Sequence, residues 1–258
     1  MSATAAGVPL ELLQRTVRDL CAIERPSASD GERQAAELVA DLLRAEGCSV
    51  RVEEERAHGG YWWPVGLLNA AAAMTAAGAL RGRASRGRRL LAAVVNAAAA
   101  AGVADDITGG RHWVRRAALP YRTTWNVVAE TGPADASRVA VVVAHHDAAH
   151  GGVVFDPRAV YALQRRHPAL FEQASRHPPV MGLVVLGPVL AAAGALLGRR
   201  GLLRAGAVVA GGTAAAMVDI ARAPVAPAAN DNASAVAALV GVARALRDDP
   251  AGDVRVLL

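Results

Sequence analysis

The chain has 258 residues, of which 53% are hydrophobic, so it has enough apolar material for a sizeable core. This composition excludes a disordered polypeptide. All 28 basic residues are arginine, and the lack of lysine excludes phosphate-loop lysines and Schiff-base catalysis. The net charge is +5, but arginine without lysine in an alanine-rich chain indicates a coding bias. We therefore predict no nucleic-acid partner.

The cysteine content and the N-terminus give two further expectations. Cys21 and Cys48 lack the spacing of metal-ligating pairs and are interpreted as reduced, packed thiols. The first 20 residues lack a basic region followed by an apolar run, so no cleavable signal peptide is predicted.

The N-terminal part of the chain has the pattern of a soluble domain. The period of its apolar residues predicts helices over residues 10–23 and 32–46. Ser29 and Glu32 can form a capping box before the second helix. Residues 48–52 then alternate in polarity like a short strand.

The pattern changes at residue 61. Residues 61–80 carry no charge and, as a helix, are long enough to cross about 30 Å of hydrocarbon. Trp62 and Trp63 lie where an aromatic belt at a membrane surface would lie. The arginine-rich stretch 81–89 and a shorter apolar run, 90–104, complete a hairpin with a basic tip.

Residues 178–221 repeat this arrangement, with arginines at positions 199, 200 and 204 and a Gly/Ala-rich second arm that is weak as a membrane helix. We predict that both hairpins anchor the chain in the cell membrane as a multi-pass protein. The alternative is a pair of buried or partner-facing hairpins, since both return arms are short. If the basic tips lie in the cytoplasm, the flanking α/β domain lies outside the cell. The lack of a signal peptide instead favours a flanking domain in the cytoplasm. The side therefore stays open.

The remaining segments predict an α/β fold. Residues 124–130 and 138–144 are rich in β-formers and suit a sheet covered on both faces. Residues 157–175 have the period of an amphipathic helix, 233–247 form another helix, and 254–258 a last strand. The expected fold is α/β, with a mixed, largely parallel sheet flanked by helices and interrupted by two helical hairpins. Its boundaries divide the chain into an α/β domain and the two hairpins, namely 1–60, 105–177 and 222–258 for the domain, and 61–104 and 178–221 for the hairpins.

The stretch VVVAHHDAAH places His145 and Asp147 at the end of an apolar strand. Open α/β folds place ligand-binding side chains at the carboxyl ends of their strands. His145 could bind a metal ion while Asp147 orients the site. The alternative is a hydrogen-bonded structural histidine. His146 and His150 are expected at the surface or at the rim of a cleft.

A second polar group, Asn230, Asp231 and Asn232, comes just before the predicted helix 233–247. The helix macrodipole favours a negative charge at this position. Capping of the helix by Asn232 or Asp231 is one interpretation. The other is a carboxylate that bridges two cations.

Together, the stretches NVVAE, VVVAHHDA, NDNASAVAALVGVARAL and VRVLL resemble the zinc-dependent aminopeptidases of peptidase family 28 in clan MH. The resemblance covers about half of the chain and implies a zinc exopeptidase-like fold. It also implies two zinc ions that activate one water, with peptides as substrates. By this resemblance His145 is a zinc ligand, Asp231 bridges the two metals, and Asp147 is the catalytic carboxylate that orients the site. A cis peptide after Asp231 is implied as well.

The same resemblance predicts further ligands after the last strand: two adjacent glutamates, then an acidic residue and a histidine. Since Leu258 precedes all of them, we expect an N-terminal fragment of an active parent, with an unpaired sheet edge, poor stability and weak zinc binding. The alternative is a catalytically inactive, membrane-anchored binding or scaffold protein with a peptidase-like fold. A small transporter is disfavoured, because the hairpins lack a suitable acid or base apart from Arg204. Substrate preference and oligomeric state stay open.

Overall fold

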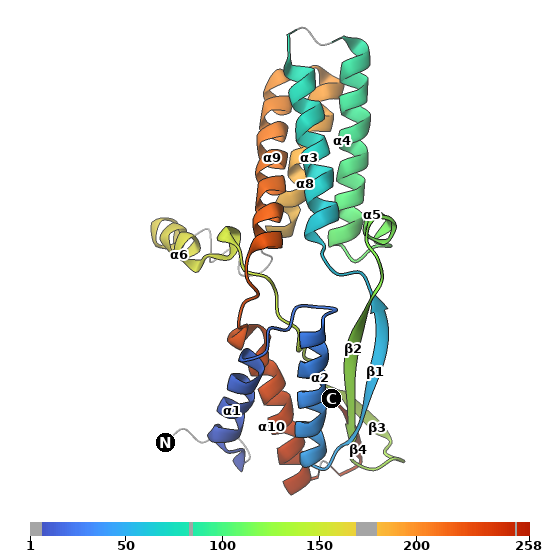
Figure 1. Cartoon of the computed structure of the whole chain (residues 1–258), viewed down its shortest axis with the longest axis vertical. Coiled ribbons are helices and arrows are strands. Elements are labelled where there is room, and N and C mark those ends of the chain that lie inside the picture. The colour runs from blue at the N-terminus through green and yellow to red at the C-terminus, as the bar shows by residue number, and fades with distance from the viewer. Residues whose placement is uncertain (1–6, 83–84, 169–179, 251) are drawn as a thin grey trace. The chain divides into compact units, whose positions relative to one another are not determined.

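The structure is a computed structural model that describes residues 7–82, 85–168, 180–250 and 252–258 (Figure 1). The chain divides into two compact units. The sheet unit comprises Met1–Gly59, Tyr121–His150 and Val225–Leu258. The helical unit comprises Gly60–Pro120 and Gly151–Pro224, so residues 105–120 and 151–168 belong with the helices and not with the sheet, where the sequence analysis had placed them.

The described residues of the sheet unit form four strands and three longer helices. The helices are α1 (Leu10–Cys21), α2 (Asp30–Ala45) and α10 (Ser234–Asp248). The strands are β1 (Ser49–Ala57), β2 (Arg122–Thr131), β3 (Arg138–Val141) and β4 (Val254–Leu257). A short kinked turn, η3 (Ala229–Ala233), precedes α10.

The expectation of an α/β fold with a largely parallel sheet is wrong. The structure is 62% helical, and its one small sheet has the strand order β1-β2-β4-β3. β2 pairs antiparallel with both β1 and β4, and among the described strands only β3 and β4 pair in parallel. The apolar run of β3 suggested a strand covered on both faces, but Val139 and Val141 are 58% and 64% exposed. Four long helices outside the sheet account for most of the helical content.

The core of the sheet unit lies between its helices and the sheet. Buried side chains of α1, α2 and α10 pack together with those of β2 and β4; they include Leu12, Leu20, Val39, Leu43, Val236, Val240, Ala129 and Val256. The predicted cap of α2 is confirmed, because the Ser29 hydroxyl accepts a hydrogen bond from the Glu32 N–H. The Glu32 carboxylate reaches back to the N–H of Ala28.

The helical unit is a bundle of four antiparallel helices that run side by side (Figure 1). They are α3 (Trp62–Leu80), α4 (Arg86–Ile107), α8 (Val180–Leu197) and α9 (Arg200–Arg222). Shorter elements are α5 (Trp113–Ala118), η2 (Val153–Phe155) and α6 (Pro157–Arg166). The predicted helix over 157–175 is thus described only as far as residue 168; the rest of it lies outside the described residues.

Small residues allow the hairpin α8–α9 to pack closely. A Cβ added at Gly206 would lie 2.4 Å from the backbone nitrogen of Ala191, and one at Gly187 would lie 2.5 Å from that of Ala210. Close approach of helix backbones through small residues is common between membrane helices.

The arginines at the hairpin tips link the two hairpins. Arg200, at the start of α9, donates hydrogen bonds to the carbonyls of Leu80 and Gly82, at the end of α3. Arg89, near the start of α4, donates to the carbonyls of Ala195 and Leu196 in α8. Each hairpin therefore supplies a cation for the free carbonyl groups at a helix C-terminus of the other.

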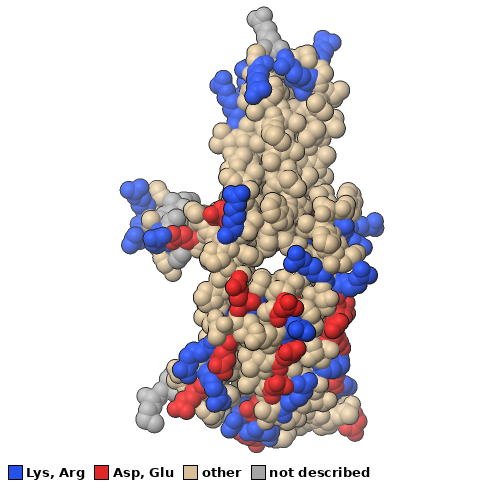
Figure 2. All heavy atoms as spheres, viewed as in Figure 1, with Lys and Arg blue, Asp and Glu red and all other residues tan. Residues whose placement is uncertain are grey.

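Three helices, α3, α4 and α9, are long and apolar enough to cross a membrane. The second helix of each hairpin is longer than the sequence predicted: α4 has 22 residues and α9 has 23. On the face shown in Figure 2, the sides of the bundle are almost free of charged side chains, which gather near the helix ends. The outward side chains include Leu67, Met74, Leu90, Val94, Val189 and Val208.

Candidate functional site

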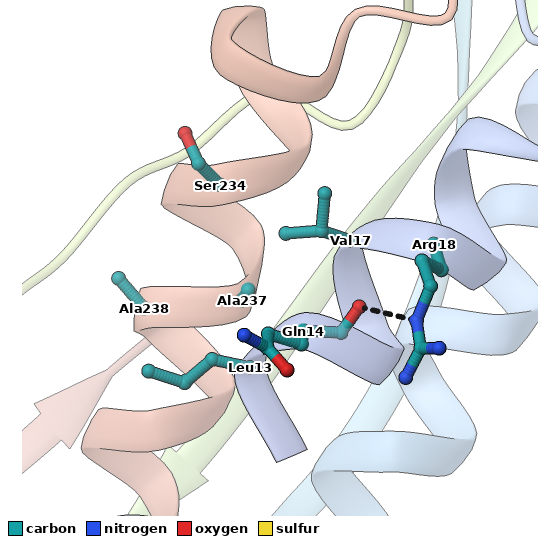
Figure 3. A pocket seen from close by; sticks show the side chains of 7 residues that line it. All are labelled: Leu13, Gln14, Val17, Arg18, Ser234, Ala237 and Ala238. Atoms are coloured by element: carbon teal, nitrogen blue, oxygen red, sulfur yellow. Dashed lines mark hydrogen bonds between the residues drawn. The ribbon is translucent and has the colours of Figure 1, made fainter. Parts of the chain in front are cut away.

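Two cavities of the sheet unit have volumes above about 500 Å³ and can hold a small ligand. The first, of about 520 Å³, lies between α1 and α10 (Figure 3). It is lined mostly by apolar side chains such as Leu13, Val17 and Ala237, and Arg18 there donates only to the backbone carbonyl of Gln14. This lining holds no carboxylate or histidine, so the cavity lacks the groups for acid, base or metal chemistry.

The second cavity, of about 510 Å³, is lined by two of the three site residues predicted from the sequence, His145 and Asp147, whereas Asp231 is not among its lining residues. His145, His146 and Asp147 line it together with Glu32 and Thr124, and its remaining lining is mainly apolar. An apolar cavity with a few convergent polar groups is the usual form of a ligand site. We therefore take this cavity as the candidate functional site.

His145 is the centre of the polar group. Its ring Nδ1 lies 3.0 Å from Oδ1 of Asp147, and its Nε2 lies 3.1 Å from Oδ1 of Asp231. The chain brings these two aspartates, 84 residues apart in the sequence, to the two edges of one imidazole ring. A histidine whose Nδ1 bonds to a carboxylate has a fixed ring orientation and presents Nε2 to a ligand. The Asp231 side chain is 82% exposed, so a ligand can reach it.

The distance between Nε2 of His145 and Oδ1 of Asp231 suits two ligands of one zinc ion. Tetrahedral zinc with bonds of about 2.0–2.1 Å separates neighbouring ligand atoms by about 3.3 Å, close to the 3.1 Å found. Within the described part of the chain, no group of three or more His, Cys, Asp or Glu side chains is arranged to hold a metal ion. The residues thus fit two positions of a zinc coordination sphere and leave the others to further ligands.

The segment around Asp231 does not cap α10. The N-cap position of α10 is Ala233, which has no side-chain cap, so the capping interpretation of Asp231 and Asn232 is wrong. Both residues have non-helical backbone angles within the turn η3. The peptide bond between Asp231 and Asn232 is cis, as the resemblance implied.

Glu32 is a buried acid of this cavity that the sequence analysis assigned to helix capping alone. Its side chain accepts hydrogen bonds from the Thr124 hydroxyl at 2.6 Å and from the Ala28 N–H at 2.7 Å. Burial raises the pKa of Glu32, the hydrogen bonds oppose this effect, and the charge of Asp147 adds to it. In the sequence, the only feature that singled out Glu32 was its position in the capping box, which does not indicate a cavity.

His146 lies in the cavity wall and not at the surface. Its Nε2 is buried without a hydrogen-bond partner in the structure. Burial lowers the pKa of His146, and the negative charge of Asp147 partly offsets this. The His146 side chain is not part of the contact between His145 and Asp231. His150 forms a β-bridge with Val225.

Comparisons of the chain with models of protein families, with curated proteins and with solved structures found no match.

Proposed function

We propose that this chain contributes a zinc-binding half-site to a membrane-anchored peptidase, most directly one that removes N-terminal residues. The observation that carries the proposal is His145, with one carboxylate at each ring nitrogen. In this assignment His145 and Asp231 bind zinc, Asp231 can bridge to a second ion, and Asp147 is the carboxylate that orients the site.

The residues of the site have roles that follow from their chemistry. Asp147 can accept a hydrogen bond from Nδ1–H of His145, and this tautomer leaves Nε2 unprotonated so that it can bind a cation. Asp231 adds a negative charge that offsets the charge of the ion. Zinc, when bound, supplies Lewis-acid polarisation of a scissile carbonyl and an activated water near neutral pH. The apolar part of the cavity, with Val236 and Leu239, can hold an apolar substrate side chain away from water.

The proposal includes insertion of all four bundle helices into the cell membrane. The three long apolar helices and their outward Leu and Val side chains support it. The apolar segment within α8, Gly182–Leu197, is shorter, but α8 packs against both α9 and α4. Exposed aromatic residues Trp63 and Trp113 lie at the helix ends away from the arginine tips, as interfacial residues do.

A binding or scaffold protein without catalysis is the second candidate. The observation that favours it is the ligand set, because a catalytic zinc ion normally takes three protein ligands and a water. His145 and Asp231 approach each other in a way that suits one ion, but no group of three or more such side chains is found within the residues that the structure describes.

Titration of the purified protein in detergent with Co²⁺ or Zn²⁺ tests the metal site. With two ligands we expect a dissociation constant of about 1 μM or weaker, that is, at most about 8 kcal/mol of binding free energy. His145→Ala and Asp231→Ala should each weaken binding at least about tenfold, because one of the two ligands is lost.

The matched controls are His167→Ala and Asp41→Ala, which remove an exposed histidine and an exposed aspartate elsewhere in the chain. Both should bind the metal like the wild type. Equal binding by all four variants would contradict the assignment of the site. Nanomolar binding by the wild type would show a third ligand and contradict the two-ligand description.

A further inference from the structure

Arg25 lies in the core of the sheet unit with its side chain fully buried, 0% exposed. A buried guanidinium normally pairs with a carboxylate, but the hydrogen bonds of Arg25 go to backbone carbonyls. Arginine keeps its charge in proteins, even though burial lowers the pKa of Arg25. A charge in this position needs a reason, and its hydrogen-bond partners supply one.

The guanidinium of Arg25 joins three separate segments of the chain. Its Nε donates to the carbonyl of His146 at 2.7 Å, within the segment that carries His145 and Asp147. Nη1 and Nη2 donate to Pro227 and Ala228, just before Asp231, at 3.1 Å and 3.2 Å. Nη1 also donates to Leu20 at the end of α1, at 2.6 Å.

The backbone of Arg25 adds to the same connection. Its carbonyl accepts the N–H of Ala148 at 2.8 Å, and Pro26 forms a parallel β-bridge with Ala148. The Ala228 carbonyl, in addition to the Arg25 guanidinium, accepts the N–H of Ala233 at the start of α10. Arg25 thus holds both segments of the candidate site by their backbones: one next to His145 and the other three to four residues before Asp231.

We propose that Arg25 is the positioning residue of the candidate site, holding the segments of His145 and Asp231 at the separation that a shared metal ion requires. The planar fork of an arginine can hold several carbonyls at fixed angles, whereas a lysine amine is a single point of donation. The metal part of this inference rests on the proposed function; the positioning of the two segments does not.

Two readouts on the full chain in detergent test the proposal in Arg25→Met and Arg25→Lys. The first, hydrogen exchange, needs no metal. We expect the amides of Ala148 and Ala233 to exchange at least about tenfold faster in Arg25→Met, while those in the middle of α2 keep wild-type rates. The second readout is the Co²⁺ affinity and absorption spectrum, with at least about tenfold weaker binding expected. Arg25→Lys should lie between Arg25→Met and the wild type in both readouts.

Two controls separate positioning from general loss of stability. Arg18→Met removes an exposed arginine of α1 and should match the wild type. Leu20→Ala removes a fully buried core side chain beside Arg25 and should lower the melting temperature, with exchange faster throughout the sheet unit. If Arg25→Met fails to fold, Arg25→Lys alone decides.

The possible outcomes are distinct. Faster exchange confined to the two site segments supports the proposal. Wild-type exchange in both Arg25 variants, or exchange raised equally throughout the unit as in Leu20→Ala, overturns it. If the wild type binds no Co²⁺, the proposed function fails, and the exchange rates still decide the role of Arg25.

Discussion

Glu32 shows how a residue that stabilises a helix start can also belong to a functional cavity. Glu32 as a residue is 4% exposed, and its carboxylate accepts hydrogen bonds from the Ala28 N–H before α2 and from the Thr124 hydroxyl. Because burial raises the pKa of Glu32, the folded protein holds the acid proton more tightly than the unfolded chain does. At a pH above the pKa of a free glutamate, about 4.3, the unfolded chain has lost this proton while the folded protein still holds it, so unfolding releases a proton. The stabilisation by the neutral acid is complete below that pH and is lost as the pH rises through the folded pKa.

The variant Glu32→Gln should remove this pH dependence. Glutamine cannot ionise, and its carbonyl and amide can still bond to the Ala28 N–H and the Thr124 hydroxyl. We expect Glu32→Gln to gain stability relative to the wild type as the pH rises above the pKa of a free glutamate, about 4.3, measured by urea unfolding at a series of pH values from about 4 to 8. Glu37→Gln, an exposed glutamate of the same helix, is the control and should follow the wild type. A constant difference between Glu32→Gln and the wild type over this range would mean that the pKa of Glu32 is not raised.

At the scale of elements, the contact of α8 with α9 depends on glycines that leave no room for a Cβ. Gly206 and Gly212 both lie inside α9, but they differ in their surroundings. A Cβ at Gly206 would meet the backbone of Ala191 at 2.4–2.8 Å, whereas a Cβ at Gly212 would meet nothing within 4 Å. The sequence showed both as equivalent residues of a Gly/Ala-rich arm, since only the packing distinguishes them.

The same substitution at these two glycines should therefore have opposite effects. Gly212→Ala should stabilise the bundle by about 0.5–1 kcal/mol through helix propensity. Gly206→Ala should destabilise it by about 1–3 kcal/mol, because the helices must move apart. Thermal unfolding in detergent measures both. Equal shifts of the two melting temperatures would contradict the close packing of α8 on α9.

At the scale of the whole molecule, the sequence indicated the candidate site residues better than the fold. His145 and Asp147 could be selected because their chemical types and spacing are local in the sequence, Asp231 was assigned through the family resemblance, and the structure brings the three side chains together. The sheet could not be predicted, because the apolar run of β3 resembles a buried strand whether or not anything covers it. Arg25 gave no signal, since its partners in the two site segments are backbone carbonyls more than 100 residues away.

The sidedness of the bundle follows from chain connectivity. Each hairpin leaves the sheet unit and returns to it along the chain, so in a membrane the arginine tips would face one side and the sheet unit the other. If the bundle is inserted, the positive-inside rule would place the tips in the cytoplasm. We expect an impermeant maleimide to label Asp135→Cys, in an exposed loop of the sheet unit, in intact cells, and Arg88→Cys at a tip only after lysis. The reverse pattern would mean that the sheet unit is cytoplasmic.

The most direct test of the proposed function is peptide hydrolysis by the protein purified from its own cells, in detergent, with and without zinc. The proposal predicts release of N-terminal residues that requires zinc, is lost in His145→Ala and persists in His167→Ala. An absence of zinc-dependent hydrolysis, or full activity in His145→Ala, would contradict it.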